Sequence, residues 1–172
     1  MVLSDGDILE YLSMGVSLIS PFNKGNLGPS SVDLSLDSNI GIYHCDIIEI
    51  GQECSSIIKK KIGHNGYLLQ PKNFILASTI EEVNIPLQLQ GFIETKGNIA
   101  RAGLQVHNCD GHIDPGFKGK ITLEIINNNI MPIKIFSGLP ICQIFFFKML
   151  NPPQNPYNGK YQKQSEPTSY LP

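Results

Sequence analysis

Residues 91–125 carry most of the side chains of this chain that could do chemistry. They include a short basic loop, with Lys96 and Arg101 on either side of Gly97, and further along a single carboxylate, Glu124, in an apolar run. A lysine, an arginine and a glycine that lets backbone N–H groups approach can together hold phosphate oxygens. A carboxylate among aliphatic neighbours loses solvation, which makes Glu124 a candidate proton shuttle. This combination predicts an enzyme that acts on a nucleotide.

Several motifs follow one another in an order that is typical of one family. The run from Lys96 through Arg101 into GL-x-VH is followed by HIDPGFKGKITLEI. SSVDL at residues 30–34 precedes this run, and NPYNGKYQKQSEPTSY at residues 155–170 follows it. In these motifs the chain resembles the dCTP deaminases of the dUTPase-like superfamily over nearly its whole length, least so at residues 39–64.

The resemblance implies a role for each site residue. Glu124 is the expected general acid/base, which takes a proton from a water that attacks C4 of cytosine. Backbone groups at residues 109–112 and 122–123 would read the cytosine ring. The expected nucleotide-binding residues are Lys96, Gly97, Asn98, Ile99, Ala100, Arg101, Asp114, Thr122, Leu123, Tyr157, Lys160 and Gln164. Three further residues are expected to organise the site: Cys109, Asp110 and His112.

Two departures from the family pattern bear on the chemistry. Lys96-Gly97-Asn98 stands where the family usually has Arg-Ser-Ser, and His112 stands where it has an arginine. Gly97 supplies no hydroxyl to position the attacking water, although a bound water could replace it. A nucleotide-binding regulatory protein with impaired catalysis is therefore one alternative.

The residue types alone leave structural alternatives open. Alternation along a strand places Glu124 on the face opposite Leu123, so Glu124 could point to solvent. Arg101 could form a structural salt bridge, and Lys96 could be an exposed loop lysine. Asp114 opens an Asp-Pro-Gly sequence, which is common turn chemistry; the resemblance implies instead that it accepts the 3′-hydroxyl of the sugar.

The tail, residues 152–172, allows two interpretations. Its prolines, glycine and polar side chains are typical of a disordered terminus. The resemblance implies a lid that folds over the nucleotide. Tyr157 would cover the base or sugar, Lys160 would meet phosphate, and Gln164 would bind hydroxyl or phosphate oxygens. Such a lid would also exclude water from the chemistry.

The resemblance implies a dCTP deaminase that produces dUTP and ammonia for pyrimidine deoxynucleotide supply. Zinc-dependent deaminases carry an H-x-E element and a P-C-x-x-C pair. The sequence contains no H-x-E element, and its four cysteines form no C-x-x-C pair. We therefore expect no zinc, and Mg²⁺ that arrives with the triphosphate. The implied partners are the nucleotides dCTP, dUTP and dTTP, and the implied assembly is a homotrimer with active sites shared between subunits.

A second activity stays open on the same residues. The diphosphatases of the superfamily use a carboxylate in a G-x-I-D turn to activate water at the α-phosphate, and residues 111–114 resemble that turn. The alternative function is thus dUTP diphosphatase activity, alone or after deamination in the same site.

Composition agrees with a single domain over residues 1–172. The net charge of −2 gives no basic field for nucleic acid. No apolar run approaches the length of a membrane span, and no leader precedes the first helix, so we expect a cytoplasmic protein without a membrane partner.

The periodicity predicts an all-β fold with one short N-terminal helix. Ser4 is the expected N-cap and Gly15 the expected C′ residue. Strands are predicted at 31–36, 40–50, 67–70, 73–79, 89–95, 121–127, 133–136 and 140–148, and a short helix at 99–103. Many short strands between turns favour a distorted barrel or jelly roll of the dUTPase-like type. The run ICQIFFF at 141–147 predicts a buried central strand or one that also contacts another subunit, and residues 59–61 an exposed loop or edge.

Overall fold

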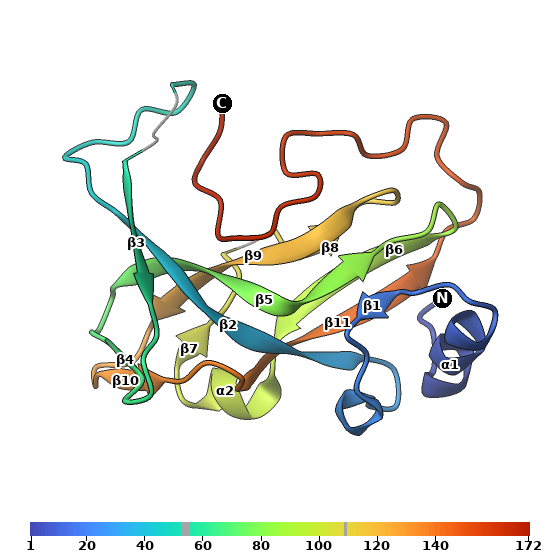
Figure 1. The fold of residues 1–172 in the computed structure, drawn as a ribbon, viewed down its shortest axis with the longest axis horizontal. Helices are drawn as coiled ribbons and strands as arrows, with labels where there is room; N and C mark the ends of the chain where they lie inside the picture. The colour runs from blue at the N-terminus through green and yellow to red at the C-terminus, as the bar shows by residue number, and fades with distance from the viewer. Residues whose placement is uncertain (53–55, 109) are drawn as a thin grey trace.

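One curled antiparallel sheet makes up most of the protein (Figure 1). The computed structural model describes residues 1–52, 56–108 and 110–172. Within them the sheet runs β7–β9–β5–β2–β11–β6–β8, with β1 added to β5 and β3 added to β2. β4 and β10 form a separate pair. The strands are β1 (Ile19–Ser20), β2 (Val32–Tyr43), β3 (Ile57–Lys61), β4 (Tyr67–Leu69), β5 (Phe74–Asn84), β6 (Leu89–Thr95), β7 (Leu104–Gln105), β8 (His112–Ile113), β9 (Lys118–Asn127), β10 (Ile133–Ile135) and β11 (Pro140–Lys148).

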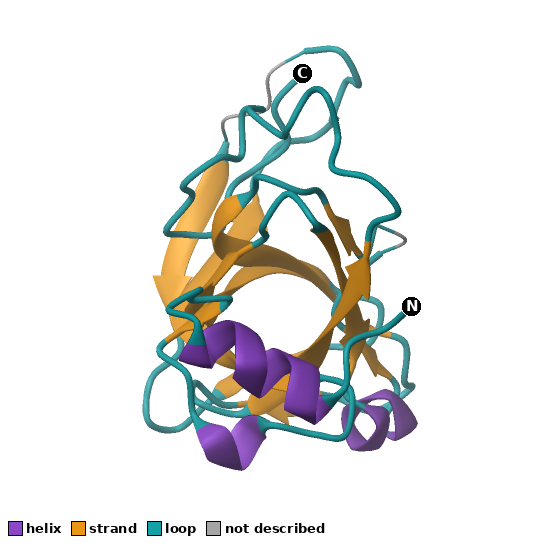
Figure 2. Ribbon diagram, turned by 90° about the vertical axis from the view of Figure 1, so that its right-hand side faces the viewer, coloured by secondary structure: helices purple, strands orange, loops and turns teal. Residues whose placement is uncertain are grey.

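The sheet curls into a half-barrel (Figure 2), which confirms the predicted all-β class. One hydrophobic core runs along it, because successive strands turn their aliphatic side chains inward. Leu34 on β2, Leu123 on β9 and Phe146 on β11 are fully buried members of this core. The curl brings the far strand β8 round toward β9, and these two strands hold the residues of chemical interest.

The N-terminal helix α1 (Asp5–Ser13) begins and ends as its sequence predicts. Ser4 accepts a hydrogen bond from the Asp7 N–H, and the Asp7 carboxylate accepts one from the Ser4 N–H, which completes a capping box. Gly15 follows the last turn with a φ of +80°, a conformation that glycine adopts without a steric penalty.

Several strand predictions need correction. The runs predicted at 31–36 and 40–50 belong to one strand, β2, which continues through the polar residues between them. Its pairing with β5 shifts register there, between Leu36 and Ile40. Residues 44–50 lie outside any strand. The lysines at 59–61 belong to the exposed edge strand β3, which agrees with the predicted edge. The short strands β1, β7 and β8 were not predicted at all.

β11 is central in the sheet but is not buried on both faces. It pairs with β2 on one side and β6 on the other. Ile144 and Phe146 enter the core, whereas Phe145 is half-buried and Phe147 is 40% exposed. The prediction of a strand buried on both faces is wrong for the face that carries Phe145 and Phe147.

Two short helical turns complete the fold. η1 (Lys24–Asn26) precedes β2, and α2 (Gly97–Arg101) follows β6, two residues earlier than predicted. In the described part of the chain, no helix is long and apolar enough to cross a membrane.

Candidate active site

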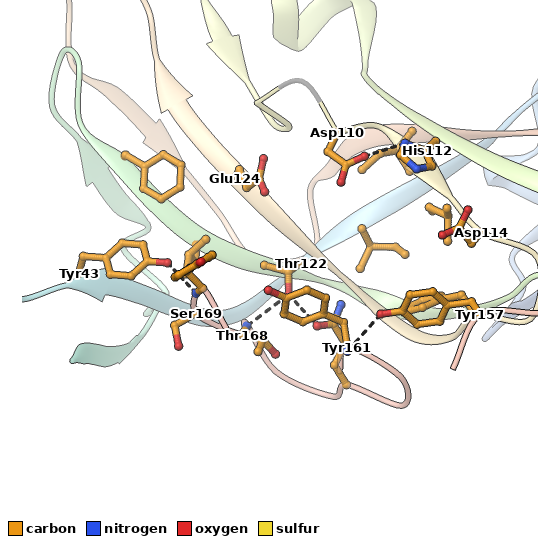
Figure 3. A pocket seen from close by; sticks show the side chains of 18 residues that line it. Tyr43, Asp110, His112, Asp114, Thr122, Glu124, Tyr157, Tyr161, Thr168 and Ser169 are labelled. Atoms are coloured by element: carbon orange, nitrogen blue, oxygen red, sulfur yellow. Dashed lines mark hydrogen bonds and ion pairs between the residues drawn. The ribbon is translucent and has the colours of Figure 1, made fainter. Parts of the chain in front are cut away.

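A pocket of about 360 Å³ lies between β9, β8 and the C-terminal tail (Figure 3). It brings together seven residues that the sequence singled out: Asp110, His112, Asp114, Thr122, Glu124, Tyr157 and Gln164. The other lining residues are Tyr43, Phe74, Leu76, Ile93, Ile113, Phe117, Ile121, Tyr161, Thr168, Ser169 and Tyr170.

Glu124 reaches the pocket from the middle of β9. Burial alternates along the strand: Leu123 and Ile125 are fully buried, and Thr122 and Glu124 are half-buried on the opposite face. That face is covered by the tail and by β8, so Glu124 points into the pocket instead of open solvent. Its Oε2 accepts a hydrogen bond from the Asn108 N–H at 2.9 Å, which fixes the carboxylate.

The hydrogen bonding along the outer edge of β9 has a gap beside Glu124. On this edge the Glu124 N–H donates to the Val106 carbonyl at 3.0 Å, and the Lys120 N–H donates to the Gln164 carbonyl at 2.9 Å. By strand alternation the N–H and C=O of Thr122 point the same way. In the described residues, no backbone or side-chain hydrogen bond reaches these two groups from that side. They offer one donor and one acceptor to a ligand beside Glu124.

The facing wall is built from β8 and the residues next to it. Asp110, His112 and Asp114 alternate with buried Gly111 and Ile113, so the three polar side chains share the pocket face. His112 Nδ1 lies 2.7 Å from Asp110 Oδ1 (Figure 3). A Cβ on Gly111 would lie 2.6 Å from the Ile93 carbonyl oxygen, so this strand can approach β6 only with glycine there.

The tail folds along β9 and forms one side of the pocket. The Lys163 N–H donates to the Lys118 carbonyl at 2.8 Å, and Gln164 Nε2 donates to the Lys120 carbonyl at 2.8 Å. A Cβ on Gly119 would lie 2.9 Å from the Gln164 carbonyl oxygen, so the close approach depends on that glycine. The tail is therefore packed over the pocket rather than extended as a disordered terminus.

The end of the tail is fastened at the far side of the pocket. The Tyr170 N–H donates to the Tyr43 hydroxyl at 2.9 Å, and the Tyr170 hydroxyl accepts from the Gly51 N–H at 2.8 Å. Lys59 and Glu166 form an ion pair at 2.5 Å. These contacts link the tail to β2, to β3 and to the loop between them.

Lys160 and Leu123 do not line the pocket with the other predicted residues. Lys160 is exposed, and its Nζ donates to the Leu171 carbonyl at 3.0 Å. The Leu123 side chain is in the core, so its backbone alone could serve a ligand. Cys109 lies outside the described residues.

The predicted basic loop lies away from the pocket within this chain. α2, whose residues are all described, is at the end of the sheet opposite the tail (Figure 1) and contributes nothing to the pocket lining. Gly97, Asn98, Ala100 and Arg101 are exposed there, and Ile99 packs on the core.

Lys96 is held by partners of its own. Its Nζ makes an ion pair with Asp33 Oδ2, and the other Asp33 oxygen accepts from Gln143 Nε2 at 3.1 Å. Gln143 Nε2 also donates to Ser31 at 3.3 Å. The lysine predicted to bind phosphate is thus tied to the SSVDL motif in this chain.

Sequence reasoning missed the aromatic end of the pocket. Tyr43 and Phe74 stack with ring centroids 6.2 Å apart, near Tyr170. Tyr170 is the last residue of the recognised tail motif, which was a usable signal. Tyr43 and Phe74 lie in ordinary strand sequence with none. Within the described residues, no three His, Cys, Asp or Glu side chains are grouped closely enough to hold a metal ion.

Solved structures identify the fold. A 2′-deoxycytidine 5′-triphosphate deaminase from Agrobacterium tumefaciens superposes with a TM-score of 0.67 at 18% identity, over 84% of this chain and 47% of that one. The EIAV dUTPase superposes with a TM-score of 0.51 at 15% identity, over 84% and 93%. The chain therefore has the dUTPase-like fold that its sequence predicted.

Sequence comparison then gives the family. The dCTP deaminase-like family model matches residues 2–149, and the chain belongs to this family. Proteins named "dCTP deaminase, dUMP-forming" are 41% identical in Sulfurihydrogenibium sp. and 40% in Persephonella marina. Each match covers 98% of this chain and 96% of the relative.

Proposed function

We propose that this protein hydrolyses dCTP twice in one pocket, first to dUTP and ammonia and then to dUMP and diphosphate. The observation that carries the proposal is the placement of Glu124 and Asp114 on facing walls of the same pocket. Each wall presents a carboxylate suited to one hydrolysis. The name of the relatives, dUMP-forming dCTP deaminases, supports the bifunctional alternative over release of dUTP as the end product.

Glu124 carries out the deamination in this proposal. It takes a proton from water as the water oxygen bonds to C4 of cytosine, and it delivers that proton to N3. Further proton transfer to the amino nitrogen lets the C4–N bond break, so that ammonia leaves and C4 keeps the oxygen. The N–H and C=O of Thr122 lie beside Glu124, without a partner on that edge among the described residues, and would hold the polar edge of the ring. Since water is activated by a carboxylate, the mechanism needs no zinc.

The second hydrolysis belongs to the wall formed by β8. Gly111, Ile113 and Asp114 supply the G-x-I-D turn, with the Asp114 carboxylate at the pocket. Water attacks the α-phosphorus there and diphosphate leaves. Without this step the product would be dUTP, as first expected from the resemblance.

A homotrimer with shared sites fits the position of the basic loop. α2 lies at the opposite end of its own chain from the pocket, so its Arg101 could reach a triphosphate only in another subunit's pocket. Phe147 and Leu150 leave apolar surface exposed for contact between subunits, at 40% and 97%. Mg²⁺ enters as part of the nucleotide substrate, where it neutralises phosphate charge.

Gly97 also bears on the regulatory alternative. A Cβ at Gly97 would meet nothing within 4 Å, so there is open space where a serine hydroxyl would lie. Gly97 is exposed, so water could occupy this position and take over the hydrogen bonds of the hydroxyl. This favours a working enzyme over a binding protein without turnover.

Product analysis tests the proposal. We would mix purified protein with dCTP and Mg²⁺ and follow ammonia, dUTP, dUMP and diphosphate over time. The expected result is ammonia and dUMP in equal amounts, with the Glu124→Gln protein as the inactive control. Ammonia with dUTP as the stable product would reduce the function to deamination, and tight dCTP binding without ammonia would favour the regulatory alternative.

A further inference from the structure

The turn between β8 and β9, residues 114–118, carries Asp114 and is bonded by two separate segments of the chain. The first segment follows β5: the Gly116 N–H donates to the Ile85 carbonyl at 2.8 Å, and the Ile85 N–H donates to the Phe117 carbonyl at 2.9 Å. The second segment is the C-terminal tail. The conformation of the turn that presents Asp114 therefore depends on a part of the chain far away in sequence.

The side-chain amide of Gln162 makes the central contact between the tail and this turn. Its Oε1 accepts from the Lys118 N–H at 2.8 Å, and its Nε2 donates to the Gly116 carbonyl at 2.8 Å. Nε2 also lies 3.3 Å from the Tyr157 carbonyl, within the tail itself. One amide thus bonds an N–H and a C=O of the turn, as the backbone of a neighbouring strand would.

Backbone groups of the tail bond the same turn on either side of Gln162 in sequence. The Tyr157 N–H donates to the Pro115 carbonyl at 2.9 Å, and the Lys163 N–H donates to the Lys118 carbonyl at 2.8 Å. When the tail is docked, the turn is therefore bonded along most of its length. If the Gln162 contacts were lost, the middle of the turn would keep only its bonds to the segment after β5.

We propose that Gln162 is a positioning residue for Asp114 in the second hydrolysis, because it ties the turn that carries Asp114 to the docked tail. Gln162 does not line the pocket, so it acts through the turn and not on the nucleotide. This inference rests on the proposed dUMP-forming function. It adds to that function a residue that couples the tail to one of the two reactions.

The two carboxylates of the pocket differ in how they are held. Glu124 lies within β9, opposite Leu76 of β5, and its Oε2 is fixed by the Asn108 N–H. None of these contacts involves Gln162. Asp114 instead follows the two-residue strand β8 and begins the turn that the tail holds. Since a displacement of about 1 Å can lower a rate about 100-fold, loss of Gln162 should affect the reaction at Asp114 selectively.

The test compares Gln162→Met with Gln154→Met, a matched change at an exposed glutamine of the same tail outside the pocket lining. Methionine has a similar length but cannot make the two amide hydrogen bonds to the turn. Each protein is given dCTP–Mg²⁺ and, separately, dUTP–Mg²⁺, and ammonia, dUTP and dUMP are measured. Gln162→Met should lower kcat for dUMP formation from dUTP about 10–100-fold. Its KM for dUTP and its ammonia release should stay within about threefold of wild type, so dUTP accumulates from dCTP.

Gln162→Glu provides a second variant of nearly the same shape. It keeps an acceptor for the Lys118 N–H but turns a carboxylate oxygen toward the Gly116 carbonyl, which cannot donate to it. It should slow dUMP formation at least as much as Gln162→Met and again spare ammonia release. Glu166→Ala loosens the tail without touching the turn, because it removes only the ion pair with Lys59. It should change both reactions by the same factor.

The inference is overturned if Gln162→Met forms dUMP from dUTP at more than a third of the wild-type kcat. It is also overturned if ammonia and dUMP fall equally in Gln162→Met, or if Glu166→Ala separates the two reactions in the same way. Either result would mean that docking of the tail as a whole, and not the position of Asp114, controls the rate. If wild-type protein makes no dUMP from dUTP, the proposed function itself fails and this inference with it, and that is seen before any variant is made.

Discussion

Glu124 meets the pocket from the centre of β9, with its Oε2 fixed by the Asn108 N–H at 2.9 Å. This hydrogen bond leaves the other carboxylate oxygen of Glu124, Oε1, available to a ligand or a water in the pocket. Among the residues that the structure describes, none bonds to the N–H or C=O of neighbouring Thr122 on the outer edge of β9.

Replacing Glu124 by glutamine should lower the rate of ammonia release by roughly 10²–10⁴-fold, because the amide accepts the Asn108 hydrogen bond but cannot take a proton. The dissociation constant for dCTP should change little. Steady-state ammonia assays and calorimetry check both values, with the exposed Glu82→Gln as control. Retention of a tenth of the wild-type rate would remove Glu124 from the mechanism.

Arg101 and Lys96 should differ sharply in their effect on triphosphate affinity. Arg101 is the only arginine of the chain and is exposed on α2, whereas the Lys96 ammonium is held by Asp33. Arg101→Ala should raise the dissociation constant for dCTP about 10–100-fold, since a charge-assisted contact contributes about 1.5–3 kcal/mol. Lys96→Met should change that constant less and lower the thermal stability instead.

Deoxycytidine is the control ligand for this comparison, because it has no phosphates to lose. Its affinity should be the same for wild type and Arg101→Ala. An equal loss for nucleoside and nucleotide would show that Arg101 supports the fold, and a larger effect at Lys96 would show that the Asp33 pair opens when nucleotide binds.

At the scale of elements, an ion pair links β2 to β9 across the strand between them, β5. Asp37 Oδ2 on β2 and Lys120 Nζ on β9 are 2.6 Å apart, although β5 lies between their strands. The ladders shift register at Leu36/Ile40 and at Ser78/Glu82, next to this pair. Burial alone would raise the pKa of Asp37, but Lys120 and the Ser38 N–H outweigh it and lower the pKa.

This lowered pKa predicts an acid-sensitive contribution to stability. Because the folded pKa of Asp37 lies below the unfolded value of about 3.9, the contribution is present above that value and is lost as pH falls through the folded pKa. Asp37→Asn should cost about 1–3 kcal/mol at neutral pH, with a smaller cost near pH 3. Urea unfolding at both pH values measures it, with exposed Asp46→Asn as control. An equal cost at both pH values would contradict the ionic origin.

The ion pair of Lys59 with Glu166 should help to hold the tail against β3, and this effect should weaken as the salt concentration rises. Both side chains are largely exposed, at 68% and 49%, so the pair is screened by salt. Glu166→Lys places a like charge against Lys59 and should speed tryptic cleavage after Lys160 and Lys163, and raise KM for dCTP about threefold or more. The difference from wild type should shrink in high salt. Unchanged cleavage would mean that the hydrogen bonds along β9 and at Tyr170 hold the tail without this ion pair.

Long strands and the capped helix were predictable, because their signals are local. Alternating side chains define β6, β9 and β11, and Ser4 with Asp7 defines the start of α1. Strands of two residues, such as β7 and β8, have no period to detect and exist because longer partners hold them. β3 was hidden by three lysines, which are common at exposed edges.

The site was predictable in residue types but not in arrangement. Alternation left Glu124 free to face solvent, and the facing β8 and the tail decide that it faces a pocket. The ion pair of Lys96 with Asp33 joins residues far apart in sequence, so no local pattern reveals it. The resemblance supplied the order of the motifs, and the fold shows that the basic loop contributes nothing to the pocket that Glu124 lines in the same chain.

For the whole molecule, this separation predicts complementation between inactive variants. If a site takes Glu124 from one subunit and Arg101 from another, mixed trimers of Glu124→Gln and Arg101→Ala contain some intact sites. Random assembly restores about a quarter of the sites, since each residue comes intact from half of the chains. Co-refolding the two variants and measuring ammonia at limiting dCTP checks this. No gain over the separate variants would place the complete site within one chain.

The docked tail also decides what happens to the intermediate. Residues 157–170 line one side of the pocket, so they would slow the exit of a nucleotide more than that of ammonia, which is far smaller. On the proposed function, the dUTP formed by the first hydrolysis would therefore stay in the pocket for the second. The fraction of dUTP that dissociates before the second hydrolysis would depend on the rate at which the tail opens relative to the rate of phosphate hydrolysis. The hydrogen bonds along β9 and at Tyr170 would thus slow the dissociation of dUTP, so that little of it reaches the free nucleotide pool.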